Sequence, residues 1–134
     1  MRVFLDTNVL VSAYATRGLC ADVLRLVLRE HELLTAEVVL SELHRILQNK
    51  MRVPPDAVQE IVAYLRQYPV EPKPEQVGEV AVRDADDAWV LASAIGAGAE
   101  VLVTGDRDLL AVAAQVEKLR ILDPRGFWEL HRSV

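Results

Sequence analysis

A single cysteine, Cys20, stands in this chain of 134 residues, so no disulfide can form within it. A lone cysteine among apolar neighbours is typical of a small core side chain in a reducing compartment, not of a nucleophile. No apolar run approaches the roughly 20 residues that a membrane-spanning helix needs. The first residues, with one basic side chain before Asp6, lack the form of a signal peptide. We therefore expect a cytoplasmic protein with no membrane association.

An excess of positive charge is also missing. Lys and Arg number 15 against 20 Asp and Glu, which gives a net charge of −5 and an isoelectric point near 5.2. The basic surface by which proteins hold nucleic acid through electrostatics alone is therefore not indicated. This counts against a passive nucleic-acid binder and counts less against a nuclease that recruits phosphate through a bound cation.

Histidine clusters and glycine-rich loops are lacking as well. His31, His44 and His131 show no spacing typical of metal ligands, and we interpret them as solvated surface residues. Gly96 and Gly98 follow a predicted helix and not the first strand, so dinucleotide binding is not indicated. With 51% hydrophobic and 26% charged residues, the chain is predicted to form one globular domain over residues 1–134.

Strand and helix patterns alternate along this chain. Short β-prone runs predict strands at 2–5, 31–35, 100–104 and 119–122, with extended pieces within 69–74 and around 80–82. Helical periodicity predicts helices at 19–29, 36–49, 57–67 after an Asp56 cap, 86–95, 108–115 and 126–132. Residues 7–18 are interpreted as a loop and turn. The alternation predicts an α/β fold with a central, mainly parallel sheet and helices on both faces.

Two aspartates follow predicted strands. Asp6 closes the first strand, and Asp106 comes after the strand at 100–104. Either one alone is accounted for as a turn residue. In open α/β sheets, however, ligands bind outside the carboxyl ends of the strands, so the two carboxylates face one crevice if their strands are neighbours.

Further acids lie on helices. Glu42 stands at the margin of an apolar helical stripe, and Asp84, Asp86 and Asp87 open the helix that contains Trp89. Taken singly, Glu42 is accounted for as a solvated residue, and the three aspartates as a cap that complements the helix dipole.

Convergence of these acids would require compensation, because neighbouring carboxylates repel one another and lose hydration. Oxygen ligands without histidine or cysteine favour a hard cation such as Mg²⁺ or Mn²⁺. Thr7, Asn8 and Thr104 are candidates to support the carboxylates through hydrogen bonds, and Asp108 is a candidate outer acid or helix cap. The arginines nearest to the acids are candidates for contacts with flanking phosphates or solvated residues: Arg17, Arg45, Arg83 and Arg107.

The order of these segments resembles that of PIN-domain proteins along nearly the whole chain. The similarity lies in four segments, residues 3–13 (VFLDTNVLVSA), 41–43 (SEL), 84–92 (DADDAWVLA) and 101–110 (VLVTGDRDLL). The chain also resembles the small stand-alone PIN proteins classed as toxins of toxin–antitoxin pairs, which are related to VapC-like toxins.

This resemblance implies a three-layer α/β/α sandwich and RNA cleavage that depends on Mg²⁺ or Mn²⁺. It implies a catalytic, metal-binding quartet of Asp6, Glu42, Asp87 and Asp106. We choose Asp87 because it directly precedes the Ala-Trp-Val-Leu-Ala helix, with Asp84 as the auxiliary ligand. A homodimer and a cognate antitoxin protein are also implied. Hydrolysis by water would leave a 5′-phosphate and a 3′-hydroxyl.

Three other functions stay open at this point. One is a non-catalytic PIN-like module that binds a protein partner. Another is a DNA-directed, structure-specific nuclease, although the chain is short for the additional elements that such enzymes carry. The third is a phosphatase of the haloacid-dehalogenase type, which would need a second acid where this chain has Asn8.

Overall fold

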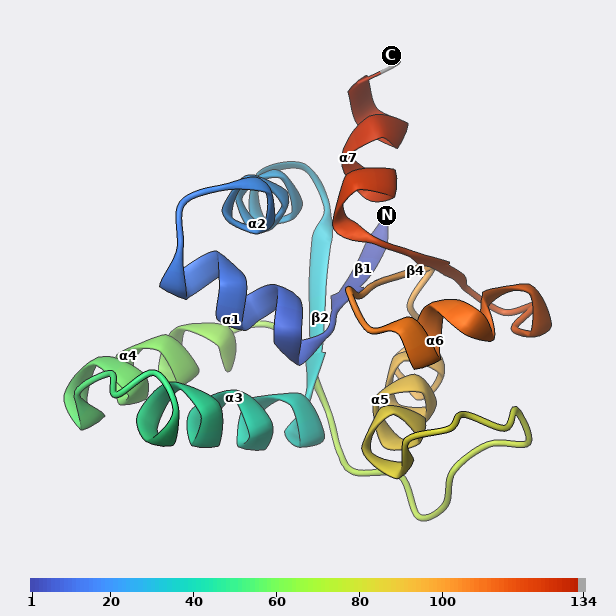
Figure 1. Cartoon of the computed structure of the whole chain (residues 1–134), viewed down its shortest axis with the longest axis horizontal. Helices are drawn as coiled ribbons and strands as arrows, with labels where there is room; N and C mark the ends of the chain where they lie inside the picture. Colours follow the sequence, from blue (N-terminus) through green and yellow to red (C-terminus); the bar gives the residue numbers. More distant parts are fainter. Residues whose placement is uncertain (133–134) are drawn as a thin grey trace.

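The computed structural model describes residues 1–132, so the last two residues of the predicted 1–134 domain lie outside the described part. The strands are β1 (Arg2–Leu5), β2 (Glu32–Ala36), β3 (Val70–Glu71), β4 (Val101–Val103) and β5 (Arg120–Leu122). The helices are α1 (Thr7–Ala15), α2 (Leu19–Glu30), α3 (Glu37–Asn49), α4 (Pro55–Leu65), α5 (Ala85–Gly96), α6 (Arg107–Ala111) and α7 (Pro124–Arg132), with a 3₁₀ turn, η1 (Ala113–Gln115). Their arrangement is shown in Figure 1. Over these residues, no helix has the length and apolar character to span a membrane.

The strands form one parallel sheet in the order β3-β2-β1-β4-β5. β1 is central, and its Phe4 is in register with Leu34 of β2 on one side and Leu102 of β4 on the other. The chain builds outward from β1 to β2 and β3, then returns across β1 to add β4 and β5. The direction of winding therefore reverses between β1 and β4. The predicted α/β class with a parallel sheet is confirmed.

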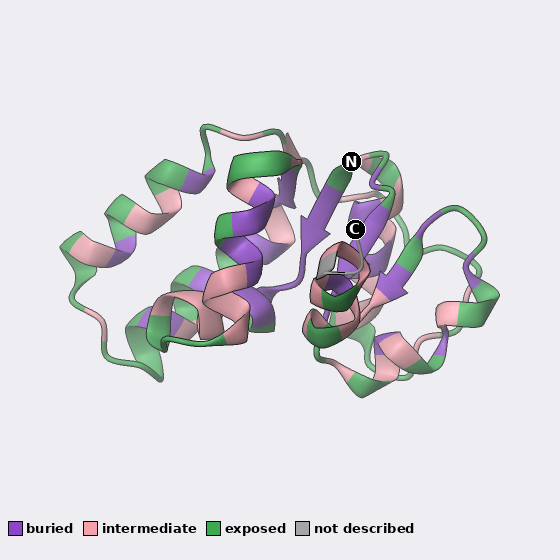
Figure 2. Ribbon diagram, turned by 90° about the horizontal axis from the view of Figure 1, so that it is seen from above, coloured by how far each residue is buried: buried purple, intermediate pink, exposed green. Residues whose placement is uncertain are grey.

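Helices cover the sheet on both sides, which gives the predicted α/β/α layering. In Figure 1 α1 to α4 lie on one side of β2, and α5 and α6 lie on the other. α2 contacts β2 and also α7, whereas α6 contacts α5 and β5. Figure 2 shows the strands as buried and the helices as exposed along their outer faces. Val3, Phe4 and Leu5 are fully buried, as the unbroken apolar run of a covered parallel strand requires.

The largest error of the sequence prediction is at residues 7–18, which were predicted to be a loop. Residues Thr7–Ala15 form α1, and Asp6 caps this helix by accepting a hydrogen bond from the backbone N–H of Thr7. The Asp-Thr-Asn segment has low helix propensity, which favoured the loop interpretation. Tertiary packing overrides that propensity, because Val9 and Leu10 are buried in the core.

Smaller corrections concern other boundaries. Residues 80–82, predicted to be extended, belong to no strand, whereas the piece predicted within 69–74 forms β3 and pairs with β2. Helix α4 begins at Pro55 after a Pro54 cap, so Asp56 lies in its first turn instead of capping it. Proline suits this first position because its missing N–H would have no helical partner there. The helix predicted at 108–115 divides into α6 and η1.

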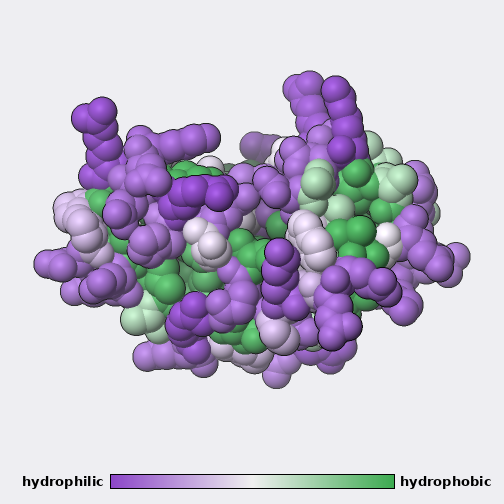
Figure 3. All heavy atoms as spheres, turned by 90° about the horizontal axis from the view of Figure 1, so that it is seen from below, coloured by the Kyte–Doolittle hydropathy of each residue, from purple (hydrophilic) through white to green (hydrophobic). Residues whose placement is uncertain are grey.

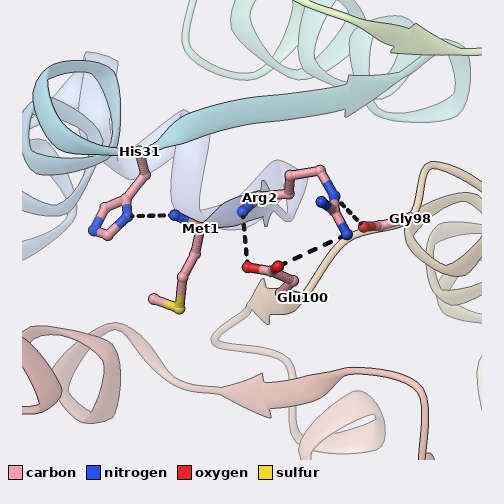
Figure 4. A network of polar contacts seen from close by, with 5 residues as sticks. All are labelled: Met1, Arg2, His31, Gly98 and Glu100. Atoms are coloured by element: carbon pink, nitrogen blue, oxygen red, sulfur yellow. Dashed lines mark hydrogen bonds and ion pairs between the residues drawn. The ribbon is translucent and has the colours of Figure 1, made fainter.

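Polar contacts hold the N-terminal end of β1, and one of them involves His31, which was predicted to be solvated. Figure 4 shows the Met1 amine beside His31 and the Arg2 side chain between Gly98 and Glu100. The amine lies 3.2 Å from His31 Nδ1. His31 Nε2 lies 2.8 Å from Nε2 of His131, a residue of α7. His31 and His131 are therefore half-buried partners instead of solvated side chains, whereas His44 is exposed as predicted.

Candidate active site

The carboxyl ends of β1 and β4 carry the most buried part of the candidate site. Asp6 directly follows β1 and is only 3% exposed. Thr104 directly follows β4, and its hydroxyl donates a 2.7 Å hydrogen bond to Asp6 Oδ2. The same hydroxyl accepts a 2.9 Å hydrogen bond from the backbone N–H of Asp106. Thr104 therefore links the two aspartates at the point where the winding of the sheet reverses, which is where open α/β sheets bind ligands.

Asn8 forms a second link across the same edge. Its amide nitrogen lies 3.3 Å from Asp6 Oδ2, and its carbonyl oxygen accepts a 3.1 Å hydrogen bond from the backbone N–H of Gly105. The side chain thus bridges the start of α1 to the loop between β4 and α6. The supporting contacts predicted for Asn8 and Thr104 are present in the structure.

Thr7 and Asp108 differ in part from the predictions: the Thr7 side chain makes no hydrogen bond to the acids, and Asp108 does not cap the helix that follows β4. The backbone N–H of Thr7 donates to Asp6, whereas its buried hydroxyl has no hydrogen-bond partner among the described residues. Asp106, and not Asp108, caps α6, because Asp106 Oδ1 accepts from the backbone N–H groups of Asp108 and Leu109. The Asp108 carboxylate is left available for other contacts.

Two helices contribute the remaining acids. Glu42 lies on α3, and Asp84 caps α5 by accepting from the backbone N–H of Asp86. Asp87 is in the first turn of α5. A pocket of about 490 Å³ brings the acids together, and its acidic lining consists of Asp6, Glu42, Asp84, Asp87 and Asp106. The structure therefore gathers all four predicted quartet residues and the predicted auxiliary Asp84, whereas Asp86 is exposed and lines a neighbouring groove.

Burial and mutual repulsion raise the pKa of two of these acids. The pKa of Asp6 rises from 3.8 to about 6, chiefly through burial, although the hydrogen bonds from Thr104 and Thr7 oppose the rise. The pKa of Asp87 rises from 3.8 to about 8 through burial and through the neighbouring Asp106 carboxylate, with smaller effects of Asp6 and Asp84. Without a cation, the pocket therefore holds protons near neutral pH that isolated aspartates would release.

This set of oxygen donors fits a hard divalent cation. Asp84, Asp87 and Asp108 each offer a carboxylate oxygen, and the three oxygens lie within 4.8 Å of one another. Mg²⁺ and Mn²⁺ prefer carboxylate oxygen, and a cation would remove the repulsion that raises the Asp87 pKa. Asp108 was predicted only as an outer acid or cap. The structure makes it a candidate ligand, which its position two residues after Asp106 does not indicate.

Basic and amide side chains of α3 also line the pocket. Arg45, Asn49 and Lys50 do so together with Glu42, and Arg45 Nη2 lies 3.8 Å from Glu42 Oε2. Of the four arginines considered from the sequence, Arg45 is the one found among the described residues of this lining. Asn49 and Lys50 were missed, although the spacing of 42, 45 and 49 on one helical face would have indicated Asn49.

Replacing Thr104 by valine tests whether its hydroxyl holds the two aspartates. We expect Thr104→Val to lower the free energy of unfolding at pH 8 by about 1–3 kcal/mol, since Asp6 and the Asp106 N–H lose a buried partner. The loss should be smaller at pH 5, where Asp6 carries a proton. Denaturant unfolding at the two pH values measures both effects.

Thr35→Val is the matched control for this measurement. Thr35 is also fully buried, but its hydroxyl has no hydrogen-bond partner among the described residues. Its replacement should leave stability unchanged or raise it, because an unpaired polar group is removed. Equal losses for the two variants would contradict the role assigned to Thr104.

The structure is therefore that of an α/β protein whose parallel sheet gathers a cluster of carboxylates at its reversal point. The PIN domain family matches residues 2–108, so this chain belongs to that family. No curated protein matches the sequence.

Solved structures with the same fold share little sequence with this chain. VapBC2 from Rickettsia felis, bound to a DNA fragment from its promoter, aligns at a TM-score of 0.66 with 17% identity, over 92% of this chain and 98% of that one. VapC20 of Mycobacterium tuberculosis, a toxin that cleaves the sarcin-ricin loop, aligns at 0.60 with 19% identity, over 88% and 98%. The PIN domain endonuclease Utp24 aligns at 0.57 with 15% identity, over 91% and 84%. At these identities the similarity establishes the fold.

Proposed function

We propose that this protein is a divalent-metal-dependent endoribonuclease and the toxin component of a toxin–antitoxin pair, with Asp6, Glu42, Asp87 and Asp106 as its catalytic residues. One observation carries the proposal: acids that follow β1 and β4 and acids of α3 and α5 line a single pocket at the reversal point of the sheet. A fold gathers such mutually repelling groups at a cost in stability, which a function that binds cations accounts for.

Mg²⁺ or Mn²⁺ would be held by the quartet together with Asp84 and Asp108. When bound, such a cation polarises a phosphate oxygen and neutralises carboxylate charge. The chain itself fixes the geometry, because Thr104 and Asn8 orient Asp6 while two backbone N–H groups orient Asp106. Side chains locked in this way are what positioning of a scissile phosphate requires.

Arg45 and Lys50 are proposed to bind the phosphates that flank the cleaved bond. Both line the acidic pocket from α3 and are exposed to solvent. An overall charge of −5 disfavours nucleic acid at long range, so local cations at the pocket are needed for productive binding. The raised pKa of Asp87 reduces the negative charge of the pocket before the cation arrives.

The proposal extends to partners. The described similarities include a toxin that cleaves RNA of the sarcin-ricin loop and a VapBC assembly bound to promoter DNA. By analogy of fold, we propose a cytoplasmic homodimer of one-domain subunits that an antitoxin protein inhibits. A non-catalytic module is disfavoured because all four acids of the quartet line the same pocket.

Cleavage assays with matched substrates test the proposed function. We expect cleavage of single-stranded RNA with Mn²⁺ or Mg²⁺, none with a chelator, and slower or no cleavage of flapped DNA. Asp6→Asn should lower the rate at least about 100-fold, since even the outer partners of metal ligands are worth 10–100-fold. The products should carry a 5′-phosphate and a 3′-hydroxyl.

Asp56→Asn is the control for Asp6→Asn in the cleavage assay, because it also replaces one aspartate by asparagine. Asp56 is an exposed residue in the first turn of α4, and its replacement should leave the rate unchanged. Preferred cleavage of flapped DNA would assign the protein to the structure-specific nucleases. A 2′,3′-cyclic phosphate product would show that the RNA hydroxyl, and not water, is the nucleophile.

A further inference from the structure

A second groove adjoins the acidic pocket. It has a volume of about 440 Å³ and lies between α3 and α5. Glu42 and Arg45 line both cavities, so the groove lies directly beside the acidic pocket. Figure 3 looks at this side of the molecule from below and shows mainly hydrophilic side chains with small hydrophobic patches between them. The groove is therefore close enough to the acids to receive a neighbouring part of a polymer bound there.

An indole ring forms one wall of the groove. Trp89 is half-buried on α5, and it shares one helical face with the groove residues Asp86 and Val90, while Asp87 lines the acidic pocket. The residues that follow Trp89 on the helix, Val90 and Leu91, are buried and hold α5 against the core. The ring is thus presented from a rigid element. An aromatic face of this kind stacks an unpaired nucleobase without regard to its identity.

A lysine covers this ring. Lys73 Nζ lies 4.6 Å from the centroid of the Trp89 ring, and Lys73 stands between Pro72 and Pro74. The two prolines restrict the backbone, so the lysine is held near the groove by a stiff segment. Its flexible side chain can move from the ring to a phosphate when a base takes its place, which exchanges a cation–π contact for an ion pair.

The groove contains three acids, but two of them are already paired with arginines, so its charge disfavours a nucleotide less than three acids would. The Glu37 carboxylate is already paired with Arg66, with Arg66 Nη2 at 3.1 Å from Oε2. Glu42 lies beside Arg45 and belongs to the proposed metal site. With Glu42 engaged by the proposed cation, Arg45 and Lys73 can face a phosphate, and Asp86 is the remaining acid of the lining.

We propose that this groove binds an unpaired nucleotide of the RNA next to the cleaved bond, with its base stacked on Trp89 and its phosphate bound by Lys73 and Arg45. The inference rests on the proposed ribonuclease function and specifies its substrate as single-stranded at that position. Base-paired RNA cannot offer a free base to the indole, so duplex RNA should be a poor substrate.

Abasic substitutions combined with Trp89→Ala test the stacking. The probe is a single-stranded RNA that the protein cleaves at one identified bond, together with versions that carry one abasic nucleotide at each flanking position. Trp89→Ala should raise KM roughly 5- to 150-fold, the range for loss of one stacked base, with little change in kcat. At one flanking position, the abasic nucleotide should raise the KM of the parent protein. In Trp89→Ala, the same abasic RNA and the intact RNA should have equal KM values.

Two conservative variants separate stacking from folding. Trp89→Phe keeps a smaller ring and should give an intermediate KM, whereas Trp128→Phe on α7 should leave KM unchanged. Trp128→Phe also leaves Trp89 as the sole tryptophan, because the chain has two. Its fluorescence should be quenched by the single-stranded RNA and not by the same RNA in a duplex.

Each result decides a different question. RNA cleavage with an unchanged KM in Trp89→Ala and no quenching would overturn the stacking inference and leave the proposed function intact. If Trp89→Ala left KM unchanged but altered the sedimentation coefficient of the protein, the groove would be an interface between proteins. That result would also overturn the stacking inference. Failure of the parent protein to cleave RNA at all would overturn the proposed function itself.

Discussion

Replacing Asp87 by asparagine is expected to make the metal-free protein more stable while it destroys the activity. The Asp87 carboxyl lies among Asp84, Asp106 and Asp6, and its pKa is raised to about 8. An acid whose pKa is higher in the folded state than in the unfolded state destabilises the fold once the pH exceeds the unfolded value. The destabilisation of the fold by burial of this charge and by its repulsion from the neighbouring acids is therefore largest at and above pH 8 and vanishes below about pH 4.

Asparagine removes this charge at every pH. We expect the free energy of unfolding of the metal-free protein to rise by about 1–2 kcal/mol at pH 8, less than the whole pKa change implies because water screens a half-buried group. The rate of RNA cleavage should fall at least about 100-fold, for the reason given for Asp6. Denaturant unfolding in the presence of a chelator and initial cleavage rates measure the two effects.

Asp56→Asn again serves as the matched control, since Asp56 lies in the first turn of a different helix, away from the acidic pocket. It should leave the cleavage rate unchanged and change the free energy of unfolding by no more than about 0.5 kcal/mol, the usual effect of a surface substitution. Lower stability of Asp87→Asn at pH 8 would show that the carboxylate is compensated within the protein itself, and the electrostatic reason for a cation would be lost.

Divalent cations are expected to stabilise the protein strongly, and more at pH 8 than at pH 5. A ligand at one hundred times its dissociation constant stabilises the folded state by about 2.7 kcal/mol. The pKa values of Asp6 and Asp87 are raised to about 6 and about 8, so at pH 5 both carboxyls keep protons that the cation must displace. At pH 8 Asp6 is ionised and Asp87 is about half ionised, so this competition is weaker, and the cation also removes the repulsion.

Thermal unfolding with Mn²⁺ or Mg²⁺ at both pH values measures the difference. Sodium chloride at equal ionic strength controls for general screening of charge. The shift caused by the cation should decrease in Asp87→Asn, which lacks one proposed ligand, and persist in Asp56→Asn. Equal shifts at pH 5 and pH 8, or an equal shift with sodium chloride, would contradict a site built from these carboxylates.

Much of the candidate site was predictable because its parts carry local signals. Asp6 and Asp106 each end a β-prone run, and the run predicts the strand whose carboxyl end bears the acid. The helical stripe that places Glu42 beside the core is equally local. Asp87 was selected from three neighbouring acids by its position before an apolar helix, and it does line the pocket. Which cation these residues bind, and whether RNA is their substrate, are predictions that the proposed assays decide.

Other features depend on contacts between distant residues. Helix α1 follows from burial of Val9 and Leu10 against other elements, which outweighs the weak propensity of Asp-Thr-Asn. The histidine pair joins residues 31 and 131, and no local pattern relates residues separated by 100 positions. The link from Thr104 to Asp6 spans 98 positions and exists only because β1 and β4 are neighbours in the sheet.

The sequence by itself determined the alternation of strands and helices and the kinds of side chain at their ends, since both depend on periodicity and on residues close in the chain. Only the tertiary structure decided that β4 pairs with β1, and with it the convergence of the acids, the place of Asp108 and the groove beside Trp89. The reason is physical: strand order is set by the packing of helices on both faces of the sheet, and the energy of that packing is shared among residues far apart in the chain.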